Sequence, residues 1–176
     1  MKDFITKTAV TLLIGGTIFT VSQVDIVQNF AEDTGLTQEQ AEQYINEIPE
    51  DELISFDELG DELIGEGQIW IDAASDIDCI NYEYEWESNM LSCSAGKSQI
   101  GKLGKDYRSL GQVYLKLGSD SASKDDISKA INLIEQLVSD YKLEVVSTMF
   151  SLEEIDEMNK TILYNKAVLK AALESD

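Results

Sequence analysis

The N-terminal part of the chain contains a run of 14 residues, from Thr8 to Val21, that carries no charged side chain. A charged group held in hydrocarbon costs on the order of a few kcal/mol, so an uncharged run of this kind is compatible with a lipid bilayer. Lys2 and Lys7 precede the run, and the next basic residue after it is Lys97. Because positive residues remain on the cytoplasmic side of a membrane, this distribution predicts that the rest of the chain lies on the extracytoplasmic side.

The length of the run is compatible with two forms of membrane targeting. A spanning helix needs about 20 residues, whereas the apolar core of a signal peptide needs roughly 7–15. Extended to Val24, the run predicts a transmembrane helix over residues 8–24 that serves as a signal anchor. Cleavage near Ser22 would instead make residues 1–24 a signal peptide and the remainder an exported protein. A buried core helix in a cytosolic protein is the third interpretation.

Charge is distributed unevenly along the chain, whose formal net charge is −21. Between Asp25 and Gly96 there are 20 acidic residues and no basic ones, whereas from Lys97 to Asp176 there are 13 acidic and 11 basic residues. An anionic field of this strength repels nucleic acid and anionic lipid headgroups, which argues against a nucleic-acid partner. It attracts basic partners or divalent cations, and it also favours solubility, so both interpretations remain open.

The acidic segment over residues 25–67 has the pattern of short helices. Apolar positions continue a helix from 24 to 32, and Gly35 is a suitable stop because glycine tolerates a left-handed conformation. Thr37 and Gln40 have the spacing of a capping box, which predicts a short amphipathic helix over residues 38–48.

A second acidic helix is expected within residues 51–64, ended by Gly65 and Gly67. Leucine and phenylalanine form one face of this helix, and carboxylates cover the opposite face. The acidic face over residues 47–66 is either a divalent-cation or partner site, or simply the solvated side of a helix. No residue of it is singled out as a metal ligand.

The clearest strand pattern lies between the two cysteines, Cys79 and Cys93. Two thiols in an oxidising compartment are usually paired, so we expect a disulfide between them. The alternation of apolar and polar residues after Cys79 is typical of a half-buried strand. We expect a small antiparallel hairpin within residues 68–99, clipped by the disulfide, with residues 68–71 as a third strand. The apolar residues of the alternation are Ile80, Tyr82, Tyr84 and Trp86.

The remainder, residues 100–176, has the pattern of a three-helix bundle. One helix is expected over 100–117, and a second begins after Ser123. The last begins after Ser151, which forms a capping box with Glu154. The stretch from 143 to 150 either continues the second helix or forms a strand, because it is rich in β-branched residues. The predicted fold class is therefore α+β and mostly helical, with an N-terminal apolar helix.

Part of the first of these helices resembles a known repeat family. Tyr107, Leu110, Gly111 and Tyr114 fit the first helix of a tetratricopeptide repeat. The chain departs from the family at Ser123, where the second helix of the repeat has alanine. The resemblance implies a helix–turn–helix unit with a groove that binds proteins or peptides. An ordinary helical hairpin accounts for the same residues.

Several classes of enzyme site are missing from the sequence. It contains no histidine, which excludes histidine-based triads and the common zinc sites. No glycine-rich phosphate loop is present, and no cofactor-binding motif is recognised. Asp76, Asp78 and Glu87 have part of the spacing of a calcium loop, but Asn81 occupies the position that requires glycine.

These observations favour a non-enzymatic, extracytoplasmic protein-interaction or structural subunit, anchored or exported, that binds a protein partner or itself. Contact with the membrane through residues 8–24 applies if that segment is uncleaved. The alternatives are a divalent-cation-binding module and a small carboxylate-dependent hydrolase. No catalytic or cofactor-binding residue is assigned. The candidate partner-binding residues are the aromatic and leucine side chains Tyr107, Leu110, Tyr114, Tyr82, Tyr84 and Trp86.

Overall fold

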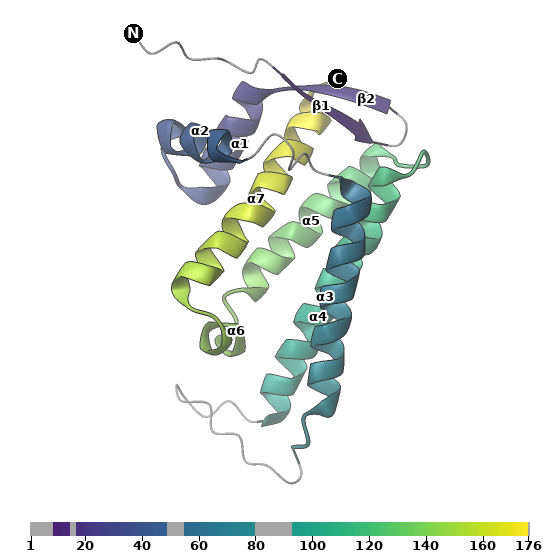
Figure 1. Cartoon of the computed structure of the whole chain (residues 1–176), viewed down its shortest axis with the longest axis vertical. Coiled ribbons are helices and arrows are strands. Elements are labelled where there is room, and N and C mark those ends of the chain that lie inside the picture. The colour runs from purple at the N-terminus through teal and green to yellow at the C-terminus, as the bar shows by residue number, and fades with distance from the viewer. Residues whose placement is uncertain (1–8, 15–16, 49–54, 80–92, 176) are drawn as a thin grey trace.

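The computed structural model describes residues 9–14, 17–48, 55–79 and 93–175. Within these ranges the chain forms two strands followed by seven helices, so the expectation of a mostly helical fold is confirmed (Figure 1). The strands lie at one end of the molecule, next to the last helix, and the long helices extend away from them (Figure 1).

The uncharged N-terminal run forms a β-hairpin, not a helix. Strands β1 (Ala9–Ile14) and β2 (Thr17–Ser22) are antiparallel, and the register pairs Ile14 with Thr17. The N-terminal apolar helix predicted above is therefore wrong. Two six-residue runs rich in threonine, valine and isoleucine flank Gly15-Gly16 in the sequence, and such a pattern favours a hairpin over a helix.

This finding overturns the predicted transmembrane helix over residues 8–24. In the described ranges, every helix is too short or too polar to cross a bilayer. The signal anchor, and the extracytoplasmic location inferred from it, are therefore not supported. Ser22, the expected cleavage position, is the last residue of β2 and pairs with Ala9.

Helices α1 (Gln23–Thr34) and α2 (Gln38–Glu47) follow the hairpin and agree with the sequence patterns. Gly35 ends α1 in the left-handed conformation with a φ of 74°. The capping box of α2 is formed: the Thr37 hydroxyl accepts from the Gln40 backbone N–H, and the Gln40 side chain accepts from that of Thr37.

Helices α3 (Phe56–Asp76) and α4 (Cys93–Gly118) pack side by side as an antiparallel pair (Figure 1). α3 does not end at Gly65 or Gly67 and continues through residues 68–71, so the predicted third strand is wrong. Gly67 is tolerated within the helix because its missing side chain lets α3 pack against α4, a tertiary gain that outweighs its low helix propensity.

Glycines seven residues apart bring the two backbones into close contact. A Cβ atom on Gly67 would lie 2.5 Å from the Gly104 carbonyl oxygen, and one on Gly104 would lie 2.6 Å from that of Gly67. Gly60 and Gly111 form a second pair, with a Cβ on Gly111 only 2.6 Å from the Gly60 carbonyl oxygen. No larger residue fits at these positions without displacing a helix. We call this contact the glycine seam.

The disulfide between Cys79 and Cys93 closes the far end of the same helix pair, with Cα atoms 5.5 Å apart. Cys93 is the first residue of α4, so the bridge joins helix ends. The predicted strand with Ile80, Tyr82, Tyr84 and Trp86 lies outside the described residues. The predicted hairpin region 68–99 is helical where it is described at its C-terminal end, because residues 93–99 belong to α4.

The C-terminal region contains α5 (Lys124–Asp140), the short α6 (Glu144–Met149) and α7 (Leu152–Glu174). Ser123 and Ser151 begin α5 and α7 with complete capping boxes, as the sequence predicts for Ser151 with Glu154. The open question about residues 143–150 is resolved as a separate helical turn. α7 lies against α1, α5 and β2, and its buried face joins the N-terminal elements to the rest of the core (Figure 1).

The glycine seam makes a stability prediction with an internal control. Gly67→Ala should lower the free energy of unfolding by about 1–3 kcal/mol, because its Cβ would overlap the backbone of α4. Gly65→Ala, two residues away with nothing within 4 Å, should raise it by roughly 0.5–1 kcal/mol. Urea denaturation measures both, and equal effects of the two substitutions would contradict the seam.

The disulfide should stabilise the fold because it restricts the conformational freedom of the unfolded chain. Replacing both Cys79 and Cys93 by serine should lower the free energy of unfolding by about 3 kcal/mol, since a loop with a sequence separation of 14 is released. Wild-type protein treated with reductant should show the same urea midpoint as the double variant. A loss below about 1 kcal/mol would show that the bridge constrains little.

Candidate interaction site

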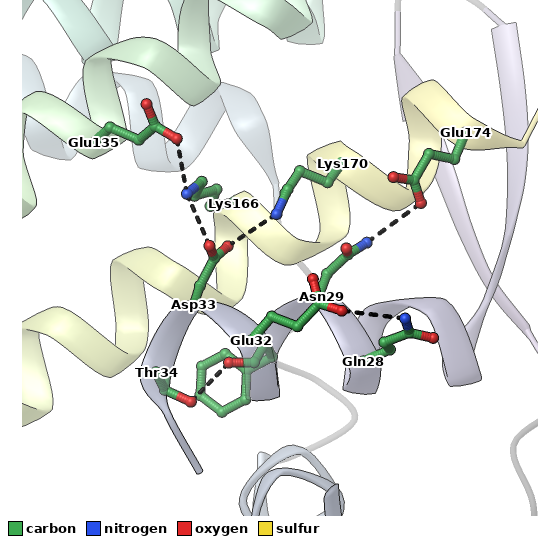
Figure 2. Close-up of polar contacts among 10 residues, drawn as sticks. Gln28, Asn29, Glu32, Asp33, Thr34, Glu135, Lys166, Lys170 and Glu174 are labelled. Atoms are coloured by element: carbon green, nitrogen blue, oxygen red, sulfur yellow. Dashed lines mark hydrogen bonds and ion pairs between the residues drawn. The ribbon is translucent and has the colours of Figure 1, made fainter. Parts of the chain in front are cut away.

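A charged cluster around the buried Lys166 joins α1, α5 and α7, as Figure 2 shows. The Lys166 ammonium group donates to Asp33 at 3.0 Å and pairs with Glu135 at 2.9 Å. Lys170 reaches the other oxygen of Asp33 at 3.4 Å. The Lys166 side chain is 8% exposed, so its charge is almost completely removed from water and depends on these partners.

The electrostatics of this cluster keep Lys166 charged. Burial alone lowers the pKa of an ammonium group, but hydrogen bonds to Glu135 and Asp33 outweigh that effect and raise the pKa of Lys166 above its usual value. A lysine that acts as a nucleophile or base needs a depressed pKa. Lys166 is therefore a structural residue that fixes α7 between α1 and α5.

A second polar cluster lies between α4 and α5. The hydroxyl groups of Tyr107 and Tyr141 are 2.6 Å apart, and Lys102 donates to both oxygens of Asp140 at 2.5 and 2.7 Å. Burial and the neighbouring Asp106 carboxylate raise the pKa of Asp140 despite its contact with Lys102. Lys102 bridges the two carboxylates, since it also bonds Asp106 at 2.8 Å.

Buried phenols in the core remain protonated. Burial raises the pKa of Tyr107, Tyr114 and Tyr141 above the usual value of a phenol. Among the described residues, the Tyr114 hydroxyl has no hydrogen-bond partner. The Asn165 side chain faces it and offsets part of the effect of burial on its pKa, although the two groups do not reach bonding geometry. A phenol held neutral in this way is a poor general base.

Three of the predicted partner-binding residues belong to the core. Tyr107 is 6% exposed, and Leu110 and Tyr114 are completely buried in α4. A partner cannot reach them in this fold, so their assignment as contact residues is corrected. Their spacing instead marks the face of α4 that packs inward. The other three residues, Tyr82, Tyr84 and Trp86, lie outside the described part of the chain.

The acidic face over residues 47–66 does not gather its carboxylates at one point in the described part of the segment. Across all the described ranges, no group of three or more acidic or cysteine side chains has the arrangement of a metal site. The carboxylates of α3 project from successive turns of one helix and are exposed to solvent.

An exposed apolar patch lies where α3 approaches the junction of α6 and α7. The rings of Trp70 and Phe150 meet edge to face with centroids 5.8 Å apart. Their neighbours in sequence are unusually exposed for their type: Ile69 by 67%, Met149 by 41% and Leu152 by 84%. We call these five side chains the apolar patch. Exposed large apolar side chains that adjoin such a ring contact in sequence are candidates for a contact surface.

Sequence reasoning missed this patch for an identifiable reason. The sequence pattern places Ile69 and Trp70 in a strand, and the apolar positions that it predicts for the last helix begin only after Leu152. Leu152 directly follows the capping residue Ser151, so it occupies a first turn in which carboxylates surround it. An apolar residue at that position is a signal that helical periodicity alone does not detect.

No protein family model, curated protein or solved structure matches the chain. The resemblance of residues around Tyr107 to a tetratricopeptide repeat therefore gains no support from a family model. The residues that carry the resemblance pack as the core of α4, with Gly111 in the glycine seam.

The charged cluster predicts a selective effect of Lys166. Lys166→Met should lower the free energy of unfolding by about 2–4 kcal/mol, because the substitution leaves the partly buried Asp33 with Lys170 alone. Lys129→Met, on the exposed surface of α5, should change it by less than about 0.5 kcal/mol. Urea denaturation of both variants tests the difference, and similar values would show that the cluster is energetically neutral.

The buried phenols predict a loss of stability in alkali. An unfolded tyrosine releases its proton near pH 10, whereas the folded protein retains it; the stabilisation is complete below about pH 10 and is lost as pH rises through the folded-state pKa. The raised pKa of Lys166 acts in the same direction. Stability measured from pH 8 to 11 should fall steeply above about pH 10, and phenolate absorbance of these tyrosines should appear together with unfolding. The stability of the double variant Tyr114→Phe, Tyr141→Phe should fall less steeply with pH. An unchanged slope would contradict the attribution of the alkaline loss of stability to these tyrosines.

Proposed function

We propose that this chain is a non-enzymatic protein-interaction or structural subunit, and that the apolar patch is its contact surface. The observation that carries the proposal is the exposure of Ile69 and Leu152 beside the Trp70–Phe150 contact. Burying two aliphatic side chains of this size is worth about 1.5–3 kcal/mol each, a large fraction of the free energy of a typical complex.

The helices beneath the patch are well suited to present it. The glycine seam holds α3 against α4, and the disulfide between Cys79 and Cys93 joins the ends of that pair. α6 also contacts α4, so both sides of the patch rest on the same helix. A surface held in this way loses little conformational entropy on binding, which favours affinity.

The buried polar groups support the non-enzymatic part of the proposal. The surroundings of Lys166 and of the buried tyrosines raise their pKa values further above neutral pH. The pKa of a catalytic acid or base is usually shifted toward neutral pH. In the described part of the chain, no specific observation favours the cation-binding module or the hydrolase.

The proposal predicts that the native protein belongs to an assembly that the patch maintains. In extracts of the cells that make it, the wild-type chain should elute well above its monomer mass of 19.6 kDa in size exclusion with light scattering. The double variant Ile69→Ser, Leu152→Ser should elute as the monomer, because it loses its apolar contacts.

Val24→Ser is the matched control, since Val24 is 72% exposed on α1 at the opposite end of the molecule (Figure 1). This variant should remain in the assembly. Elution of the wild-type chain as a monomer, or equal loss of assembly in both variants, would contradict the proposal.

A further inference from the structure

Carboxylates flank the apolar patch on both elements that form it. On α3, Glu66 lies three residues before Ile69 and Asp72 lies three residues after it, so each acid is a neighbour of Ile69 on the helix surface. Both acids are exposed. On α7, the exposed Glu153 and Asp156 lie one and four residues after Leu152. The patch therefore has an apolar centre and an acidic rim.

Little positive charge offsets this rim. Residues 55–79 contain eight acidic residues and no basic one. Lys97 and Arg108 of α4 reach α3, where Lys97 donates to the Ser75 and Ile77 carbonyl oxygens and Arg108 donates to the Gln68 side chain. On α7, Lys160 pairs with Asp156 at 2.7 Å and with Glu157 at 3.2 Å, and among the described residues no ion pair involves Glu153. The rim is therefore a net negative field around an exposed apolar centre.

We propose that the apolar patch binds a basic amphipathic helix of another protein, with Lys or Arg of that helix placed over Glu66, Asp72 and Glu153. This proposal rests on the proposed function and names the chemistry of its partner. In the described ranges the patch consists of side chains from α3, α6, α7 and Phe150 between the last two, and no strand edge lies among them, so a partner must be recognised through its own side chains. An amphipathic helix supplies an apolar stripe with charges on either side of it.

Charge also argues against a second copy of this chain as the occupant. Two patches meeting face to face would bring their acidic rims together, in a protein whose formal net charge is −21. Like charges opposed across an interface disfavour association, whereas opposite charges accelerate it. The apolar centre would gain the same burial from either partner, so the rim decides between them.

The test uses the full chain and a synthetic 18-residue helix of leucine and lysine, about five turns in length, labelled for fluorescence anisotropy. A scrambled peptide of the same composition, without an apolar stripe, measures attraction to the acidic protein as a whole. The scrambled peptide should bind at least tenfold more weakly. The protein variant Ile69→Ser, Leu152→Ser keeps the net charge and should lose at least tenfold in affinity for the amphipathic peptide, whereas Val24→Ser should bind as wild type does.

A second pair of variants tests the rim. Glu66→Gln with Asp72→Asn should weaken binding and reduce its dependence on salt, because two charge contacts are lost. Asp120→Asn with Asp125→Asn removes the same charge from the exposed surface before and at the start of α5 and should have little effect. Equal binding of the two peptides, or equal effects of the two pairs, would overturn the proposal.

Two further results separate this inference from the proposed function. If the native assembly depends on Ile69 and Leu152 but the basic peptide does not bind, the proposed basic partner is wrong, whereas the proposed function of the patch as a contact surface stands. If purified wild-type protein forms a dimer that Ile69→Ser, Leu152→Ser dissociates, a second copy occupies the patch and the basic partner is excluded.

Discussion

Close backbone contact between α3 and α4 is the constraint on which the rest of the structure depends. At the glycine seam, a Cβ atom on Gly67 or Gly104 would overlap the opposing carbonyl oxygen. The two helices therefore pack at a distance that larger residues do not permit, and the side chains on either side of the seam interdigitate around it. The seam sets where Trp70 emerges, and hence where it meets Phe150.

The interior uses charge for a different purpose from the surface. Lys166 ties α1 to α5 and α7 through Asp33 and Glu135, and removal of one partner leaves a charge in a poorly solvated place. At the surface, the carboxylates beside Ile69 remain in water and act at longer range. Charged residues thus fix the relative positions of the helices around Lys166. On the surface, they favour a partner of opposite charge.

Local sequence signals identified several elements correctly, and their failures share one physical origin. The capping boxes at Thr37 and Ser151 need only residues three apart, so they form wherever the chain is helical. Gly65 and Gly67 were interpreted as a helix end, which is their usual local meaning. The structure retains the helix there, because contact with Gly104 outweighs the propensity penalty of about 1 kcal/mol per glycine.

Sequence alone determined the mostly helical character, the C-terminal end of α1 at Gly35, the capped starts of α2 and α7, and the acidic charge of the first half, because these depend on residues close together in the chain. Only the tertiary structure decided that the run around Gly15-Gly16 pairs with itself as strands, that Tyr107, Leu110 and Tyr114 are buried, and that Ile69 and Leu152 are exposed. Each of those outcomes depends on which distant surface covers a side chain, and an apolar residue has the same local pattern whether it is covered or left in water.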